Sequence, residues 1–272
     1  MKDTVEQEKE MSFLDHLEVL RWHLIRSAFA IFTVGVVLFV YQKQVYENFL
    51  LAHLNGNFPS YGWLCKLSAV FNIDSGFCTV KYPTVLQSLS PTNQLSNSIW
   101  SSIILGFIIA FPYVLFEVWK FISPGLNPKE RTSSKGFIFI SSFLFFSGVA
   151  FSYFIIAPLS VYFFFNYQIT DMIQNNFNFS SYISMITNTL LGVAIVFELP
   201  IVIYFLTKIG LVTPEFLKRS RKYAIIVVLI LAAIITPPDV ASQIIVAIPI
   251  MFLYEVSIFI SKMVIKKQNK NV

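Results

Sequence analysis

Two carboxylates, Glu198 and Glu255, lie inside stretches of sequence that are otherwise apolar. A charge at the centre of a lipid bilayer costs at least about 2.5–3.5 kcal/mol, so an acid there needs a polar partner or has a function. No lysine or arginine is expected at the depth of either acid. Two interpretations remain. Each acid is a protonated carboxyl group that hydrogen-bonds Tyr204, Tyr254 or a backbone carbonyl, or it is a polar group that binds another molecule. We favour the second interpretation.

A third acid, Glu130, follows the turn signals Pro124–Gly125 and Asn127–Pro128, which predict a rigid loop. An ion pair of Glu130 with Lys129 or Arg131 in water would contribute little to stability. A fixed carboxylate, by contrast, is able to accept a guanidinium group from another chain through two parallel hydrogen bonds. Both interpretations stay open at this point.

Residues 11–27 combine an apolar stripe at helical spacing with polar residues that lie off the stripe, among them Glu18 and Arg21. This pattern predicts an amphipathic helix at a membrane surface. An ordinary interfacial anchor is the simpler interpretation of the pattern by itself.

The sequence shows no group of residues at the spacing that a catalytic site or a metal site requires. His16, His23 and His53 are scattered, and the sequence has no nucleophile elbow, phosphate-binding loop or Cys/His ligand spacing. We therefore expect a protein that is not an enzyme and that has no metal or cofactor.

The composition is that of a helical membrane protein with several spans. Of 272 residues, 56% are hydrophobic and 13% are charged, and the mean hydropathy is +0.67; a soluble domain is about 25% charged. The net charge of +5 comes from basic loops, which indicate topology rather than a nucleic-acid partner.

Six apolar runs predict an all-α bundle of six transmembrane helices in one domain, residues 1–272. The third run is one long helix with a kink at Pro158 and an end at Asn166. The fifth is too short, because Tyr223–Ile235 rises only about 20 Å against a hydrocarbon core of about 30 Å. The runs lie at about 24–42, 98–119, 136–166, 185–206, 223–236 and 240–261.

Basic residues orient these spans. Seventeen of the twenty lysines and arginines lie in or beside four segments that six spans place on one side. By the positive-inside rule that side is cytoplasmic, and both termini are on it. The first span carries no cleavage site and is expected to be retained. The cytoplasmic segments are 1–23, which is amphipathic, 120–135, 207–222 and the tail 262–272.

The loop 43–97 is then extracytoplasmic and contains both cysteines, Cys65 and Cys78. Two cysteines thirteen residues apart on an oxidising face favour a disulfide. Two unpaired thiols in a partly buried loop are the alternative.

The order of short motifs resembles the TatC family, the multispanning subunits of the twin-arginine protein translocase. The motifs cover nearly the whole chain: "HLEVLR", "WKFISPGLNPKER", "FSYFIIAPL", "FELP", and "TPPD" followed by "SQ" and "AIP". Each motif by itself is weak, whereas the set in this order is specific.

The resemblance implies a concave, glove-like bundle in a bacterial-type inner membrane, with the last two helices short. It further implies that the chain binds twin-arginine signal peptides of folded precursor proteins at the cytoplasmic face. TatA- and TatB-type single-span subunits and other copies of the chain are the implied partners within the bilayer, and the proton-motive force drives export.

Matching motif positions gives the implied site residues. Signal-peptide binding falls on Glu130, Phe121, Pro124 and Arg21, with Glu18 beside Val19, where the family has its second acid. Thr132 replaces a further arginine of the family pattern. The groove and partner-docking residues matched in this way are Glu198, Tyr153, Pro200, Asp239 and Gln243, and we add Glu255 to them as the second acid within a span.

A rival function explains the two acids within the spans equally well. In a proton-coupled carrier of small solutes, Glu198 and Glu255 would be the protonatable pair. That alternative gives no role to the rigid acidic loop or to the short fifth span.

Overall fold

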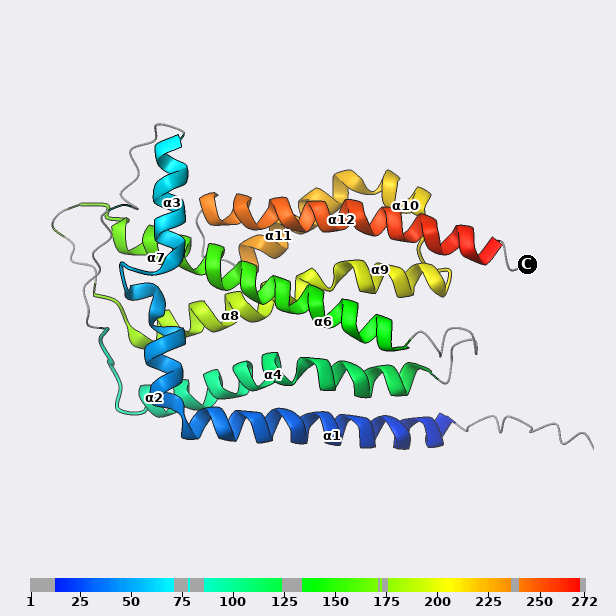
Figure 1. Cartoon of the computed structure of the whole chain (residues 1–272), viewed down its shortest axis with the longest axis horizontal. Coiled ribbons are helices and arrows are strands. Elements are labelled where there is room, and N and C mark those ends of the chain that lie inside the picture. The colour runs from blue at the N-terminus through cyan, green and yellow to red at the C-terminus, as the bar shows by residue number, and fades with distance from the viewer. Residues whose placement is uncertain are drawn as a thin grey trace, which may run out of the picture.

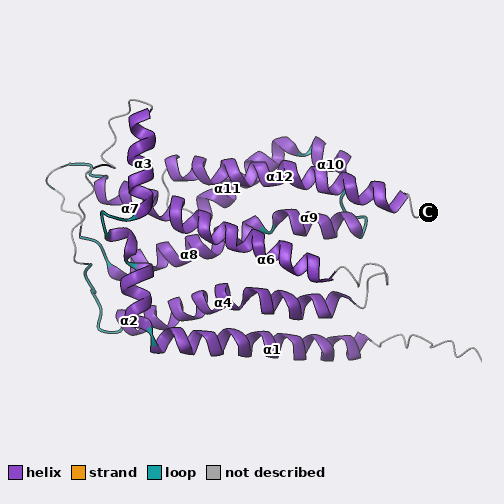
Figure 2. Cartoon of the chain, in the orientation of Figure 1, coloured by secondary structure: helices purple, strands orange, loops and turns teal. Residues whose placement is uncertain are grey.

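The computed structural model describes residues 13–70, 78, 86–123, 134–170, 172, 176–235 and 240–269. Within these ranges the chain is helical, apart from loops and one isolated bridge between Gln87 and Asn178 (Figure 2). Pro124, Glu130 and Asp239 lie outside the described residues.

Long helices lie side by side along one axis of the molecule (Figure 1). Five segments are long and apolar enough to cross a membrane: Leu17–Val40, Asn93–Ile122, Gly136–Asn166, Phe179–Lys208 and Gln243–Lys267. The first, second and fifth segments belong to α1 (Phe13–Val40), α4 (Asn93–Ile122) and α12 (Val240–Asn269). The third consists of α6 (Ser134–Phe151), η5 (Ser152–Ile156) and α7 (Ala157–Asn166), and the fourth of α8 (Phe179–Phe197) and α9 (Leu199–Lys208).

The fifth apolar run forms a short helix, as predicted, but it is not among the five candidate spans of the described residues, and the expectation of a short last helix is wrong. Helix α11 (Arg221–Ile235) has 15 residues, which fits the apolar run that ends before Pro237–Pro238. Helix α12 has 30 residues, because it continues past Pro249 and through Lys266 and Lys267. A short helix α10 (Pro214–Arg219) precedes α11.

The two ends of the bundle differ in charge. What we call the basic end is where α1 begins and α4, α9, α10 and α12 end, with basic residues in the last turns of the latter four. The opposite end, which we call the disulfide end, carries α2 (Gln42–Val45), η1 (Tyr46–Leu50), η2 (Ala52–Leu54) and α3 (Pro59–Val70). Helix α3 runs across the direction of the long helices (Figure 1).

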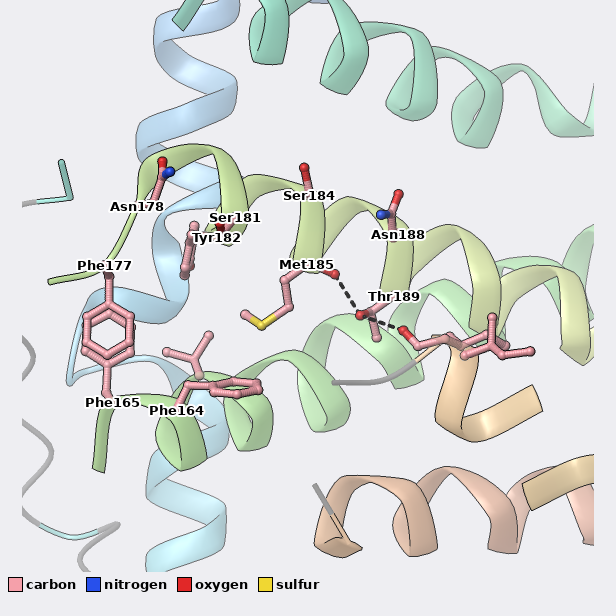
Figure 3. Close-up of a pocket in the computed structure, with 13 residues that line it drawn as sticks. Phe164, Phe165, Phe177, Asn178, Ser181, Tyr182, Ser184, Met185, Asn188 and Thr189 are labelled. Atoms are coloured by element: carbon pink, nitrogen blue, oxygen red, sulfur yellow. Dashed lines mark hydrogen bonds between the residues drawn. The ribbon is translucent and has the colours of Figure 1, made fainter. Parts of the chain in front are cut away.

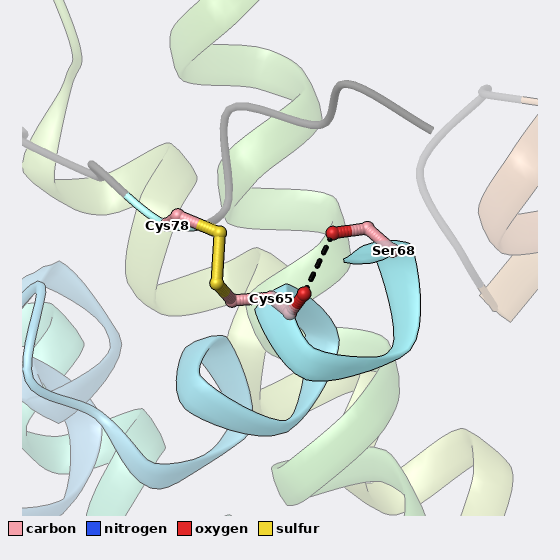
Figure 4. Close-up of a disulfide and its surroundings, with 3 residues drawn as sticks. All are labelled: Cys65, Ser68 and Cys78. Carbon is pink, nitrogen blue, oxygen red and sulfur yellow. Dashed lines mark hydrogen bonds between the residues drawn. A yellow bond between two sulfur atoms is a disulfide. The ribbon is translucent and has the colours of Figure 1, made fainter. Parts of the chain in front are cut away.

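A disulfide joins Cys65 in α3 to Cys78, with the two Cα atoms 4.9 Å apart (Figure 4). Ser68 donates a hydrogen bond to the Cys65 carbonyl in the same helix at 2.8 Å. The bridge closes a short loop, so it restricts the unfolded chain around α3.

The third helical run is one continuous helix that ends at Asn166, as the sequence predicts. The irregularity lies one turn earlier than Pro158, in the π-turn η5. In that turn the Tyr153 carbonyl accepts a hydrogen bond from His53 Nε2 at 2.9 Å. The π-turn thus fixes the disulfide-end segment to the long helix.

Helices α1 and α4 meet through small residues. A Cβ atom at Gly106 of α4 would lie 2.9 Å from the Ile31 carbonyl oxygen and 3.0 Å from the Gly35 nitrogen. Small residues let two backbones approach this closely, and close approach drives helix association where the surrounding lipid is as apolar as the protein.

Replacing Gly106 by valine is therefore expected to push α1 away from α4 and to destabilise the fold by about 1–3 kcal/mol. Thermal unfolding of the purified protein in detergent measures the change. The matched control is Gly62→Val, because no atom lies within 4 Å of a Cβ at Gly62. Equal midpoints for the two variants would contradict the close contact.

Burial lowers the pKa of His53 from 6.5 to about 4, because the desolvated ring resists charge more than its backbone hydrogen bonds favour it. The unfolded chain then binds the proton more readily than the folded chain. The contribution of His53 to stability is therefore complete above about pH 6.5 and is lost as the pH falls toward 4.

We expect the midpoint of thermal unfolding to fall between pH 6.5 and pH 4 more steeply in the wild type than in His53→Gln. A glutamine amide is able to donate to the Tyr153 carbonyl but does not titrate. Identical pH profiles for the two proteins would rule out His53 as the source of the slope.

Candidate functional site

Glu198 lies at a break between two helices. It ends α8 and precedes α9, in which Pro200 occupies the first turn and is buried. Proline has no backbone N–H and restricts the residue before it, so the sequence "FELP" interrupts the helix at the acid. The interruption places a carboxylate within a helical span.

One oxygen of Glu198 is paired and the other is not. Ser141 of α6 donates a hydrogen bond to Oε2 at 2.5 Å. Oε1 is buried and has no hydrogen-bond partner among the described residues. The two tyrosines considered as partners lie elsewhere: Tyr254 donates to the Leu217 carbonyl, and Tyr204 accepts from Lys208.

This carboxylate lines a cavity of about 240 Å³ between α4, α6 and α9. On the cavity wall the Trp119 ring stacks on the Phe137 ring, and Phe205 meets Phe137 edge to face. Apart from Ser141, Glu198 and the Trp119 indole nitrogen, which has no hydrogen-bond partner among the described residues, the lining is apolar. An unpaired oxygen in such a wall costs about 1–3 kcal/mol, so the cavity favours an occupant that brings a hydrogen-bond donor with an apolar surface.

Two of the other expected groove residues hold the fold together. The Tyr153 hydroxyl donates to the Phe49 carbonyl at 3.1 Å, and the two rings stack with centroids 4.3 Å apart. Gln243 of α12 donates to the Leu229 carbonyl of α11 at 3.0 Å. Neither of them lines the Glu198 cavity.

The expectation that Glu255 has no basic partner is wrong. Arg221 Nη2 lies 2.7 Å from Glu255 Oε2, and both side chains are about half exposed. The pair forms because α11 begins with Arg221 and packs beside α12, so a basic residue reaches Glu255 from the neighbouring helix.

A larger cavity of about 380 Å³ lies between α7 and α8 toward the disulfide end (Figure 3). Phe164 and Met185 converge in it, and the Thr189 hydroxyl bonds both the Met185 carbonyl and the Ile235 carbonyl at the end of α11. The cavity therefore lies where the short α11 stops. It contains no charged side chain.

The expected signal-peptide residues that the structure describes all lie at the basic end. Glu18 and Arg21 are exposed on the first turns of α1, and Phe121 is half buried at the end of α4. Val19 is less exposed than Glu18. The one-residue shift of the acid therefore puts its side chain on the outer side of α1, about 100° around the helix.

Sequence reasoning missed a buried ion cluster at the same end. Glu117 of α4 is 2% exposed and accepts a hydrogen bond from His23 Nδ1 at 2.6 Å. Glu117 lies within the predicted span 98–119, so the criterion that selected Glu198 would have found it. His23 lies in the segment that the sequence predicts to be an amphipathic surface helix, and its spacing from the other two histidines indicates no site.

Comparisons with known proteins give the family. Residues 15–249 match the family model described as Sec-independent protein translocase protein (TatC). The chain is 39% identical over 263 residues to the Sec-independent protein translocase protein TatC of Blattabacterium sp. subsp. Periplaneta americana, covering 96% of this chain and 99% of that one. It is 34% identical over 262 residues to the TatC of Aquifex aeolicus, with 96% and 98% covered.

A solved structure shows the same fold. A crystal structure of the twin arginine translocase receptor TatC superposes with a TM-score of 0.71 at 34% identity, covering 92% of this chain and 99% of that chain. The chain is thus a multi-pass membrane protein with the TatC fold.

Replacing Glu198 by methionine together with Ser141 by alanine is expected to leave the thermal midpoint unchanged or to raise it. Methionine has a similar size, fits the apolar wall and removes an unpaired oxygen, and alanine avoids leaving the buried Ser141 hydroxyl without its acceptor. By contrast, Glu117→Met leaves His23 without its acceptor and is expected to lower the midpoint. Thermal unfolding in detergent measures both. A large loss of stability in Glu198→Met/Ser141→Ala would show that the acid serves the fold.

Proposed function

Because this chain belongs to the TatC family, we propose that it receives the signal peptides of folded precursors for protein export. Its cytoplasmic face binds the two consecutive arginines, and its groove docks TatA- and TatB-type single-span subunits. As a translocase subunit it is a transporter and not an enzyme.

The charge distribution supports the proposed orientation. Both described ends of the chain, α1 and α12, lie at the basic end, which the positive-inside rule assigns to the cytoplasm of a bacterial inner membrane. With α11 counted as a short sixth span, the helices form the concave bundle of the family. Neighbouring copies of the chain would complete the complex within the lipid bilayer.

The observation that carries the docking function is the unpaired oxygen of Glu198 in an apolar wall. A transmembrane helix of another subunit offers an apolar surface, and one polar side chain on it would satisfy that oxygen. In the same way, a guanidinium group supplies the planar pair of donors that a loop carboxylate at Glu130 would bind. Export is then driven by the proton-motive force.

The rival carrier function loses its basis in the pairing of Glu255. That function was based on Glu198 and Glu255 as a protonatable pair, and Glu255 instead pairs with Arg221 in a half-exposed position. Glu255 does not line the cavity of Glu198. We therefore do not propose solute transport.

Replacing Glu130 by glutamine is expected to abolish export of a twin-arginine reporter protein while the variant remains inserted in the membrane. The amide keeps the size of the side chain but loses the charge that binds arginine. The matched control is Lys129→Gln, which removes a neighbouring charge and is expected to leave export intact. Export in cells lacking the native chain provides the measurement.

A photo-crosslinker at position 130 tests direct contact. Labelling of a twin-arginine precursor is expected, and labelling should disappear when both arginines of the precursor are replaced by lysines. Normal export by Glu130→Gln would contradict the assignment. Equal crosslinking of the precursor with two arginines and the precursor with two lysines would also contradict it.

A further inference from the structure

Two cations lie close to the buried carboxylate of Glu117. Lys120 Nζ is 3.7 Å from Oε1, and Arg26 Nη1 is 4.0 Å from Oε2. The side chains of Arg26 and Lys120 are 54% and 45% exposed, whereas that of Glu117 is 2% exposed. The positive charges thus face outward, and the negative charge lies behind them.

This cluster adjoins the proposed arginine-binding residues. The His23 ring lies edge-on to the Phe121 ring, with the centroids 6.4 Å apart. On α1, Glu18 precedes His23 by five residues, a rise of about 7.5 Å. Both elements that carry the proposed site therefore meet at the Glu117–His23 pair.

The position of the two cations creates an electrostatic problem for the proposed site. When the two arginines of a signal peptide bind at this surface, their positive charges come close to those of Arg26 and Lys120. Repulsion between these like charges weakens binding of the peptide. One unit charge about 10 Å away, at an effective dielectric constant of about 20, changes a binding constant about tenfold or somewhat more.

We propose that Glu117, held in place by His23, is a positioning residue that neutralises Arg26 and Lys120 and so lets the adjacent surface accept two arginines. The proposal rests on the proposed receptor function and deepens it. Glu117 itself is too buried to contact a peptide. Its effect reaches the peptide through the charge and the placement of Arg26 and Lys120.

The net charge of the cluster predicts the order in which the variants bind the peptide, with weaker binding at higher positive charge. With a neutral His23, the three groups Glu117, Arg26 and Lys120 sum to +1 in the wild type, +2 in Glu117→Gln, +1 in Arg26→Gln/Glu117→Gln, and 0 in Arg26→Gln. The glutamine at 117 still offers an oxygen to His23 Nδ1, so the substitution removes charge and keeps the hydrogen bond.

The experiment measures binding of a fluorescent synthetic peptide with two consecutive arginines to the full-length chain in nanodiscs. Glu117→Gln is expected to bind about tenfold more weakly than the wild type, and high salt should narrow the gap, because salt screens exposed charges. Adding Arg26→Gln to Glu117→Gln should restore binding. Arg26→Gln by itself should bind more tightly than the wild type, a gain that misfolding does not produce.

Several results would overturn the proposal. Wild-type affinity in Glu117→Gln would show that the buried charge does not act on the site. Equal weakness of the single and the double variant would assign Glu117 a structural role. An unchanged affinity in Arg26→Gln would remove the repulsion on which the argument depends.

Glu130→Gln separates this proposal from the receptor function. If Glu130→Gln binds the peptide as the wild type does, the receptor assignment fails. If Glu130→Gln binds weakly while Glu117→Gln binds normally, the receptor assignment stands and the proposed role of Glu117 fails.

Discussion

The constraint on which this structure depends is that a carboxylate in a largely apolar helical bundle must find a partner. Lipid offers no hydrogen bonds, so each acid is satisfied by the protein, by water at the ends of the bundle, or by another molecule. Glu117 is satisfied by His23 and Glu255 by Arg221, whereas Glu198 retains an unpaired oxygen next to an apolar cavity.

Backbone irregularities place these groups where regular helices would not. The π-turn η5 offers the Tyr153 carbonyl to His53 and so fastens the disulfide-end segment to the longest helical run. The break before Pro200 leaves Glu198 at the junction of two helices, against Ser141. In both cases a proline follows within a few residues. Backbone groups that the irregularity releases from regular helical hydrogen bonds find partners inside the protein, as a membrane span requires.

The sequence predicts the helices well because their signals are local. Apolar runs, the end at Asn166 and the short fifth span follow from hydropathy, turn residues and prolines. The partners of charged groups depend on which helix faces which, and a single sequence does not contain that information. Glu255 was therefore expected to have no partner, although Arg221 lies only one helix earlier. His23 and Glu117, 94 residues apart, were missed for the same reason.

The family motifs do not supply this information either, because a motif identifies positions in the sequence but not the contact that each side chain makes. "FSYFIIAPL" and "SQ" contain Tyr153 and Gln243, and both of those side chains hold helices together. "FELP" contains Glu198, whose second oxygen has no hydrogen-bond partner among the described residues. A polar residue in a membrane bundle is thus a candidate for binding when it has an unpaired buried atom and also lines a cavity. Ser60, Ser142 and Ser152 have such atoms but line neither cavity, whereas Glu198 and Trp119 line the same one.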